Sequence, residues 1–537
     1  MLFVNDIFKR MNAIIMAAGT SSRFAPLSYE KPKGLLKVKG EVLIERQIRQ
    51  LQEAGICDIT VVVGYKAEMF EYLKGKFGID IVMNEDYNRF NNTSSIIRVI
   101  DKLEDTFVCS SDNYFPTNVF VEKSTSSYYS ALYAEGKTNE YCLSIDAEDN
   151  IVHVEVGGED SWYMVGHAFF SKDFSCQFRE IMLREYVNDE TKKGYWEDVY
   201  IRYINQLPLM KVHRYRPHDI EEFDTLDELR QFDEEYVNNT NSSVFRNICR
   251  ILHCEEKDIC DIVVLKKGMT NSSFCFKCIK DGRKYVYRHP GDGTESFISR
   301  ESEYFSMKVA NELGLDKTYI YMHPTEGWKI SYYIENAQTL DYHNKEDLEN
   351  ALHLLAKLHS ANVQSDFTYR LWDQANSFFD MLRKEGKDDA ADFYDLYKRM
   401  EKIYKKVQGD GWPECLNHCD ALAANFLIEI DSPTREMSLI DWEYSGQGDT
   451  AQDLGSFIAC SDMSYDEAVS AIAIYLGHAP SNEELRHFIA YTALASYCWL
   501  LWATYQESHG VDTGEFLQLW YDYTYLYSSK AMEFYQI

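Results

Sequence analysis

Apolar and polar positions along the first 110 residues alternate between two patterns. Four short, largely β-branched apolar runs are typical of buried parallel strands. They are Asn12–Ala18, Asp58–Gly64, Ile79–Met83 and Thr106–Ser110. The segments between them have helical spacing, at Leu43–Ala54, Lys66–Phe77 and Thr93–Leu103. This rhythm predicts an α/β domain with a parallel sheet, helices on both faces, and ligands at the carboxyl ends of the strands.

The pattern changes near the middle of the chain. Phe232–Ser243 (FDEEYVNNTNSS) is acidic and rich in Asn and Ser, so we expect a seam there, between a domain at 1–235 and one at 245–537. Beyond it the pattern is mostly helical from about Leu348. Three antiparallel strands are predicted before that point, at Asp261–Leu265, Phe274–Ile279 and Lys284–Arg288. A small β lobe followed by a helical lobe is the order found in protein kinases.

Composition and charge narrow the class of protein. The chain of 537 residues is 45% hydrophobic and 26% charged, as in ordinary globular proteins, and its net charge is −31. Such a charge disfavours nucleic acid and anionic lipid as partners. No apolar run is long enough to cross a membrane, and we expect no signal peptide in the first residues. The 13 cysteines, odd in number, are expected to be reduced thiols. We therefore expect a cytoplasmic enzyme of small molecules; a homo-oligomer is compatible with this.

The first predicted strand leads into a string with the residues of a phosphate site, Met16–Lys37 (MAAGTSSRFAPLSYEKPKGLLK). Gly19, with Ala18 before it, lets backbone N–H groups approach a phosphate closely. Arg23 and Lys33 can neutralise a triphosphate and the charge that develops at its α-phosphorus. A plain strand-to-helix turn with a solvated basic loop is the alternative, and the whole string argues against it.

This string resembles the signature of sugar-1-phosphate and phosphocholine nucleotidyltransferases, which have a Rossmann-like α/β fold. Asn91–Ile96 (NNTSSI) resembles the nucleotide-proximal loop of the cytidylyltransferase branch, which implies CTP as substrate and contacts from Thr93 and Ser94. The resemblance covers about residues 11–230 and implies Mg²⁺ ligands at Asp112, in SDNYF, and at Asp224, in EFDTLDEL. Without it, Asp112 reads as a strand-end cap and Asp224 as a helix N-cap.

Aromatic residues in the first half are candidates for the acceptor site. Aromatic faces with one carboxylate suit a trimethylammonium group. The candidates are Trp162, Tyr195, Trp196 and Glu197. Aromatic residues clustered on a helix are also typical of a core, and the sequence leaves both interpretations open.

The second half carries the string His418–Asn425 (HCDALAAN), which has the spacing H-x-D-x₄-N. Asp441 follows sixteen residues after Asn425. Phosphoryl transfer needs a carboxylate to orient the acceptor hydroxyl and oxygen ligands for Mg²⁺ between nucleotide phosphates. Asp420 fits the first role, and Asn425 and Asp441 fit the second. An isolated HxD is weak, but the full spacing favours a phosphotransfer centre.

Segments upstream of this string fit the same chemistry. Lys267–Phe276 (KGMTNSSFCF) has one glycine and small polar residues that can cover nucleotide phosphates, with Gly268 and Asn271 as candidates. Arg288 stands where protein kinases have a strand Lys. We expect Glu301 to pair with it; Glu303 is the alternative, because the spacing does not decide between them.

These strings resemble choline and ethanolamine kinases and the wider aminoglycoside phosphotransferase group over about residues 245–530. The resemblance implies a protein-kinase-like α+β fold, ATP as donor, and a hinge at Ser331–Ala337 that holds adenine near Tyr333. It also places an aromatic cage around the ammonium group of choline, with Glu443 well sited to add negative charge. The cage residues are Trp499, Trp502 and Tyr521. The alternative is that the Trp pair belongs to the core.

Together the halves predict a bifunctional enzyme of CDP-choline synthesis that phosphorylates choline with ATP and then couples phosphocholine to CTP. The competing pair is a sugar or ethanolamine kinase fused to the matching sugar-1-phosphate or phosphoethanolamine nucleotidyltransferase. A non-catalytic binding module or a scaffold is a further alternative. The intact set of predicted polar site residues argues against it: Asp112, Asp224, Asp420, Asn425 and Asp441.

Overall fold

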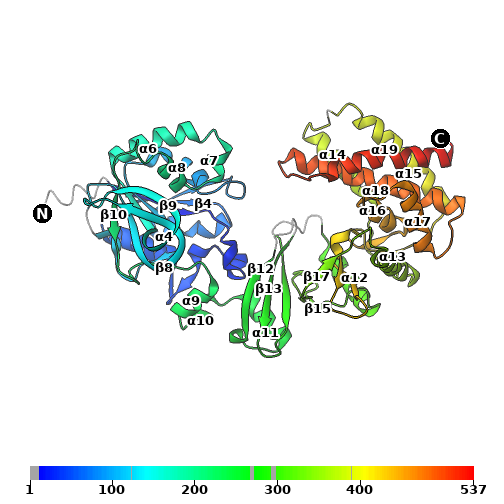
Figure 1. Ribbon diagram of the computed structural model, residues 1–537, viewed down its shortest axis with the longest axis horizontal. Coiled ribbons are helices and arrows are strands. Elements are labelled where there is room, and N and C mark those ends of the chain that lie inside the picture. Colours follow the sequence, from blue (N-terminus) through cyan, green and yellow to red (C-terminus); the bar gives the residue numbers. More distant parts are fainter. Residues whose placement is uncertain (1–10, 122–123, 266–270, 292–297, 389) are drawn as a thin grey trace. The chain divides into compact units, whose positions relative to one another are not determined.

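The computed structural model describes residues 11–121, 124–265, 271–291, 298–388 and 390–537 (Figure 1). The chain forms two compact units, and the first ends at Lys257 while the second begins at Asp258. The division therefore lies beyond the acidic stretch in which we expected the seam, and that stretch belongs to the first unit.

Seven described strands of the first unit form one sheet in the order β10-β8-β9-β6-β1-β4-β5. Its parallel half confirms the α/β prediction and consists of β1 (Met11–Ala17), β4 (Asp58–Val63), β5 (Asp80–Met83) and β6 (Asp105–Ser110). Successive residues of β1 enter opposite faces, so Ile14 joins one buried core and Ile15 the other. The expected helices are present as α3 (Leu43–Glu53), α4 (Tyr72–Phe77) and the short α5 (Thr93–Ile97).

The other half of the sheet is a long antiparallel hairpin of β8 (Tyr128–Ile145) and β9 (Ile151–Phe170). It joins the parallel half where β9 pairs with β6, and β10 (Lys211–Arg214) lies parallel to β8. Three helices lie on one side of the sheet in Figure 1, and side chains of α6 and α8 enter the core that contains Ile14. They are α6 (Lys172–Glu185), α7 (Asp189–Lys193) and α8 (Trp196–Arg202).

The acidic, Asn-rich stretch is helical and not a loop. It spans the end of α9 (Leu226–Phe232), the short α10 (Tyr236–Thr240) and the start of α11 (Ser243–Leu252). Hydroxyl side chains suit helix starts, and Ser242 accepts a hydrogen bond from the amide of Phe245 at 3.2 Å. Asn and Ser therefore mark helix boundaries here.

The second unit begins with an antiparallel sheet of five described strands in the order β12-β13-β14-β16-β15. The three strands predicted from the sequence are β12 (Ile259–Val264), β13 (Asn271–Cys278) and β14 (Lys284–Pro290), followed after α12 (Arg300–Glu312) by β15 (Tyr319–Met322) and β16 (Lys329–Tyr332). This small β lobe and the helices after it confirm the kinase-like α+β prediction.

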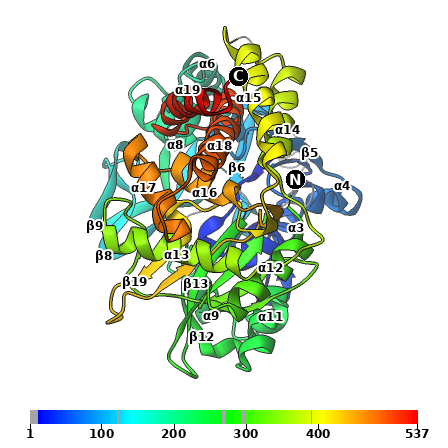
Figure 2. The same cartoon turned by 90° about the vertical axis from the view of Figure 1, so that its right-hand side faces the viewer.

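The helical lobe is built around α18 (Asn482–Ser508), which lies between α16 (Ala451–Ala459) and α19 (Phe516–Tyr535) in both views (Figures 1 and 2). The other long helices are α13 (Lys345–Ser360), α14 (Leu371–Lys384), α15 (Phe393–Val407) and α17 (Tyr465–Leu476). Short strands carry the polar loops, namely β17 (Ala337–Thr339), β18 (Glu414–Asn417), β19 (Phe426–Glu429), β20 (Met437–Leu439) and β21 (Gly446–Asp449). Within the described ranges, no helix has both the length and the apolar character that a membrane span requires.

Candidate active sites

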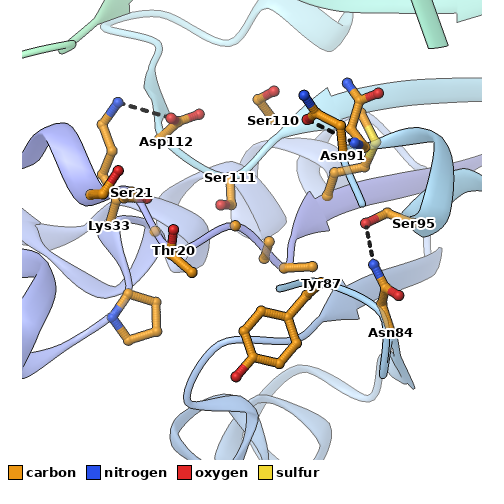
Figure 3. Close-up of a pocket in the computed structure, with 18 of the residues that line it drawn as sticks. Thr20, Ser21, Lys33, Asn84, Tyr87, Asn91, Ser95, Ser110, Ser111 and Asp112 are labelled. Atoms are coloured by element: carbon orange, nitrogen blue, oxygen red, sulfur yellow. Dashed lines mark hydrogen bonds and ion pairs between the residues drawn. The ribbon is translucent and has the colours of Figure 1, made fainter. Parts of the chain in front are cut away.

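A cavity of about 590 Å³ opens at the carboxyl ends of the parallel strands in the first unit (Figure 3). Ala18 and Gly19 reach it after β1, Asn84 after β5, and Ser111 after β6. A Cβ atom added to Gly19 would meet nothing within 4 Å, so the backbone there is open to a ligand. The cavity thus lies where parallel α/β sheets bind their ligands.

Two cation–carboxylate pairs line this cavity. The Nζ atom of Lys33 lies 2.9 Å from Oδ2 of Asp112, as Figure 3 shows, and a guanidinium nitrogen of Arg23 lies 3.3 Å from Oδ1 of Asp224. Burial alone would lower the pKa of Lys33, but the carboxylates of Asp112, Glu222 and Asp224 together outweigh it, and the pKa is raised. Lys33 is therefore a firmly charged, nearly buried cation. The structure brings these four sequence-predicted residues to one cavity.

The two carboxylates fit a Mg²⁺ ion that nucleotide phosphates also bind. The side chains of Asp112 and Asp224 are 25% and 43% exposed and line the same cavity, so each can offer oxygen to a ligand. Among the described residues, no group of three or more Asp, Glu, His or Cys side chains is placed to hold a metal by itself. Two carboxylates completed by phosphate oxygens are a common Mg²⁺ site.

The structure turns Thr93 and Ser94 away from the cavity. Both are fully buried: the Thr93 hydroxyl donates to the carbonyl of Thr191 at 2.9 Å, and the Ser94 hydroxyl donates to that of Asn91 at 2.6 Å. The expected nucleotide contacts from these two side chains are therefore corrected. Ser95, one residue further along α5, lines the cavity and accepts a hydrogen bond from Asn84 at 3.1 Å (Figure 3).

The aromatic candidates of the first unit separate into core and cavity residues. Trp196 is 1% exposed and stacks on Tyr129 with ring centroids 5.6 Å apart, so it belongs to the core and not to an acceptor cage. Its place in the first turn of α8 directs it toward the sheet. Trp162 packs against Tyr133 and has Arg214 over its ring, outside the residues that line the cavity. Tyr195, directly before α8, does line it.

Glu197 sits behind the cavity wall. Its carboxylate accepts hydrogen bonds from the hydroxyl of Tyr129 at 3.0 Å and from the amide of Asn92 at 3.2 Å, and Asn92 lines the cavity. Burial raises the pKa of Glu197 to about 7, against the effect of these hydrogen bonds. From this position the Glu197 carboxylate can influence a ligand through the two residues that donate hydrogen bonds to it, Asn92 and Tyr129.

Sequence reasoning missed several residues that line this cavity, among them Asn84, Tyr87, Ser111, Lys193 and Glu222. Asn84 and Ser111 could have been found, because they directly follow the predicted strands at 79–83 and 106–110, which are β5 and β6 of the structure. Tyr87 lies in a turn four residues past β5, and Lys193 is the last residue of α7, so neither directly follows a strand.

In the second unit, Asp420 and Asn425 are brought together by the loop between β18 and β19. The Asn425 side-chain amide donates to the Asp420 carbonyl at 2.8 Å and to its carboxylate at 3.0 Å. Burial and the nearby Asp441 carboxylate raise the pKa of Asp420 to about 7. A carboxylate that titrates near neutrality is suited to accept a proton from a substrate hydroxyl.

Asp453 of α16 holds this loop in place. Its carboxylate accepts hydrogen bonds from the amides of His418 at 2.7 Å and Cys419 at 2.6 Å, and from Nε2 of His359 at 3.0 Å. Nε2 of His418 in turn donates to the carbonyl of Ile440 at 2.9 Å, next to Asp441. His418 and Asp453 therefore hold the loop that carries Asp420.

Arg288 pairs with Glu303 and not with Glu301. A guanidinium nitrogen of Arg288 lies 2.5 Å from Oε1 of Glu303, which is fully buried, whereas Glu301 is exposed. Arg288 also lies 3.4 Å from Oδ1 of Asp441, and Arg300 lies 3.0 Å from Glu303. Residues 300 and 303 share one face of α12. Glu301 lies two residues before Glu303, about 200° around the helix, so it is exposed and does not reach Arg288.

Glu443 belongs to the same charged cluster. It is buried, accepts a hydrogen bond from the Asn271 amide at 2.8 Å, and lies 4.0 Å from Arg288 and 3.9 Å from Arg300. The expectation that it adds charge to a choline pocket is therefore corrected, because its carboxylate faces the arginines. Gly268, the other phosphate-loop candidate, lies outside the described residues.

Tyr333 follows β16, where the hinge was expected. Its amide donates to the carbonyl of Lys284 at 3.1 Å, so this amide is used within the β lobe. Its side chain is 37% exposed and lines a cavity of about 380 Å³ with Glu335 and Glu429.

Three indole rings meet where α18 and α19 pack together. Trp499, Trp502 and Trp520 have ring centroids 6.0–6.2 Å apart in every pair. Tyr521 lies elsewhere, with its hydroxyl donating to Asp392 at 2.8 Å. Trp520 is the third ring of this group; it is buried in the core of the helical lobe, and the partly buried Trp499 and Trp502 pack against that core. The sequence shows Trp520 beside Tyr521, but choosing between neighbours requires knowing how α19 is rotated.

Comparison with known proteins matches each unit to a family. Residues 13–142 match the model of the MobA-like NTP transferase domain, and residues 262–517 match that of choline/ethanolamine kinase. The chain is 35% identical over 233 residues to a 2-aminoethylphosphonate cytidylyltransferase of Lancefieldella rimae, covering 43% of this chain and 94% of that protein. It is 32% identical over 231 residues to a choline-phosphate cytidylyltransferase of Streptococcus pneumoniae, covering 43% and 100%.

The second unit has its own curated relatives. Protein LicA of Haemophilus influenzae is 25% identical over 262 residues, which is 46% of this chain and 94% of that protein. Together with the cavity at the strand ends and the Asp420 loop, these matches identify both halves as enzymes. The chain belongs to the cytidylyltransferases of the MobA-like NTP transferase family through its first unit, and its second unit is a choline/ethanolamine kinase domain.

Proposed function

We propose that this chain makes CDP-choline from choline in two steps. The second unit transfers the γ-phosphoryl group of ATP to choline, and the first unit couples the phosphocholine formed to CTP with release of pyrophosphate. The observation that carries the choice of choline is the group of three indoles, Trp499, Trp502 and Trp520, because indole faces are the side chains that attract a quaternary ammonium most strongly.

In the kinase step, Asp420 orients the choline hydroxyl and accepts its proton as the oxygen bonds to the γ-phosphorus and ADP leaves. Its raised pKa, about 7, supports this role near neutral pH. Arg288 is held by Glu303 at 2.5 Å and faces Asp441 at 3.4 Å, so it presents a fixed positive charge to the nucleotide phosphates.

In the transferase step, a phosphate oxygen of phosphocholine attacks the α-phosphorus of CTP, and the bond from that phosphorus to the bridging oxygen breaks. Lys33 and Arg23 neutralise the charge that gathers on the phosphates, and the open backbone at Gly19 accepts them. Tyr195 lines the cavity and can contact the trimethylammonium group. Positioning and charge neutralisation carry this step, with no covalent intermediate on the protein.

Mg²⁺ would be held by Asp112 and Asp224 in the first unit and by Asn425 and Asp441 in the second, where it would neutralise phosphate charge. The open carboxylates of the first pair support this, as does the oxygen-only donor set of both.

A second acceptor deserves a test because the relative with the higher identity of the two cytidylyltransferases, at 35% against 32%, acts on 2-aminoethylphosphonate. Its primary ammonium can donate hydrogen bonds, which choline cannot, so a site rich in carboxylates would favour it. Glu197, half-buried behind Asn92, is the group that would bear on this choice.

One experiment tests the proposal. The full chain is incubated with ATP, CTP, Mg²⁺ and an equimolar mixture of choline, ethanolamine and 2-aminoethylphosphonate, and the products are followed by mass spectrometry. CDP-choline as the main product, with phosphocholine as its precursor, supports the proposal. CMP-2-aminoethylphosphonate or CDP-ethanolamine as the main product overturns the choice of choline.

A further inference from the structure

The segment that follows the sheet and helices of the transferase unit touches the part of the chain that carries Lys33. Lys33 lies between α2 (Leu27–Glu30) and the β2–β3 hairpin (Lys37–Val38 and Glu41–Val42). The segment in question, 232–243, runs from the end of α9 through α10 to the start of α11 and was expected to be a mere seam. Its contacts bear on the transferase site.

The first contact is at the tip of the hairpin. Lys39 and Gly40 both have positive φ, 49° and 85°, which is the backbone of a two-residue I′ turn. A lysine at φ 49° is disfavoured by contacts of its Cβ, so this turn needs support from outside. Asp233 supplies it by accepting a hydrogen bond from the Lys39 amide at 2.8 Å.

Phe232 makes the second contact from the same segment. The Lys39 ammonium lies 3.8 Å from the centroid of the Phe232 ring. The Phe232 ring also lies against Phe223 and against Tyr114, with centroids 5.2 Å and 5.3 Å away, and Tyr114 stands two residues after Asp112. One aromatic ring thus touches both the hairpin beyond Lys33 and the strand beyond Asp112.

The third contact is on the other side of Lys33. The Glu30 carboxylate accepts a hydrogen bond from the Ser243 amide at 2.6 Å, and the Ser243 hydroxyl also donates to it. Residues 30 and 39, on either side of Lys33, are therefore both held by the segment 232–243. The helix α10 fills the space between these points by packing against β2.

We propose that the segment 232–243 is a brace that positions Lys33 against Asp112 for cytidylyl transfer, with Asp233 and Glu30 as positioning residues. The inference rests on the proposed role of Lys33 at the phosphates. Lys33 is 7% exposed and its Nζ lies 2.9 Å from Asp112, so a shift of its backbone moves the charge directly. A misplacement of about 1 Å can cost on the order of 100-fold in rate.

The test is a double-mutant cycle in the full chain, measured as pyrophosphate release from CTP and phosphocholine. Asp233→Ala is expected to lower kcat at least about ten-fold, while Glu234→Ala, an exposed carboxylate one residue away, leaves it unchanged. In the Lys33→Ala background, Asp233→Ala should have little further effect, because the brace then has no cation to position. Equal fold-losses in both backgrounds would mean only general loosening and would overturn the proposal.

Choline phosphorylation by the same preparation serves as the control for folding and should be unchanged in every variant. If Asp233→Ala does not fold, Glu30→Gln and Ser243→Ala replace it, and each is expected to lower kcat roughly two- to five-fold. An unchanged kcat in both variants overturns the proposal. If the wild-type chain does not use phosphocholine, the proposed acceptor fails, and the same cycle is then read with CTP and 2-aminoethylphosphonate.

Discussion

Lys33 and Asp112 form an ion pair in the wall of the cavity of the first unit, with Nζ 2.9 Å from Oδ2. The Lys33 ammonium and the carboxylate of Asp112, a proposed Mg²⁺ ligand, are in direct contact and balance each other's charge. Phosphates that enter the cavity would compete with Asp112 for Lys33. In the proposed transferase step, this pair marks the place of the α-phosphate of CTP. The first two predictions follow from this site and from its counterpart in the kinase unit.

Replacing Asp112 with Asn should stop the second reaction and not the first. The variant keeps the side-chain shape but loses a negative oxygen, so kcat for CDP-choline formation should fall on the order of 100-fold, equal to about 2.7 kcal/mol. With choline, ATP and CTP together, phosphocholine should accumulate, which phosphorus NMR would follow. Undiminished CTP turnover would mean that Asp112 serves only to balance Lys33.

Asp420→Asn should have the opposite effect. Its carboxylate is the proton acceptor, so ATP-dependent phosphorylation of choline should fall on the order of 1000-fold. CDP-choline formation from added phosphocholine should stay within about two-fold of wild type, because Asp420 lies in a different compact unit. Loss of both reactions in a folded protein would contradict the assignment of one reaction to each unit.

The aromatic cage can be tested by comparing two neighbouring residues. Trp520→Ala should raise KM for choline about ten-fold or more, since a desolvated cation–π contact is worth about 2 kcal/mol and 1.4 kcal/mol is a factor of ten. KM for ATP should not move. Tyr521→Ala should leave KM for choline unchanged, because its hydroxyl bonds to Asp392. A larger effect at Tyr521 would restore the cage expected from the sequence.

Glu197 gives a prediction about pH and stability. Its pKa is raised from 4.5 to about 7 in the folded chain, so folding is favoured while it is protonated and loses this contribution as pH rises through 7. Glu197→Gln stays neutral, so its Tm relative to wild type should increase by a few degrees between pH 5 and pH 8. Thermal unfolding at both pH values measures this. A constant difference would show that Glu197 is charged in the fold.

The elements that the sequence predicted well are those with a strong local pattern. The strands at 12–18, 58–64 and 106–110 are buried on both faces, and nothing but a buried strand suits such runs. The hairpin β8–β9 was not predicted, because its middle is alternately exposed and carries charged residues that give no core signal. The stretch 232–243 was taken for a linker because its helices are short and polar.

The site residues that were predicted wrongly share one cause. The sequence pointed to Thr93 and Ser94, whereas Ser95 lines the cavity. It pointed to Glu301, whereas Glu303 pairs with Arg288, and to Tyr521, whereas Trp520 lies beside the Trp pair. Each lies at or near a helix start or on a helix, where every step of one residue turns the side chain by about 100°, so a shift of one or two residues changes the face it occupies. A motif gives the position of a site to within a turn. The rotation of the helix, which packing against the rest of the fold decides, then selects the residue.

The contact of Arg288 with Glu303 has a consequence for control of the enzyme. Protein kinases make and break the corresponding ion pair to switch activity on and off. Here Glu303 is fully buried and shared with Arg300, so separating the pair would leave buried charges without partners at a cost of about 3–5 kcal/mol. An ion pair that is buried and shared in this way is poorly suited to act as a switch. We therefore expect the Arg288–Glu303 pair to stay closed in the kinase unit both with and without its substrates.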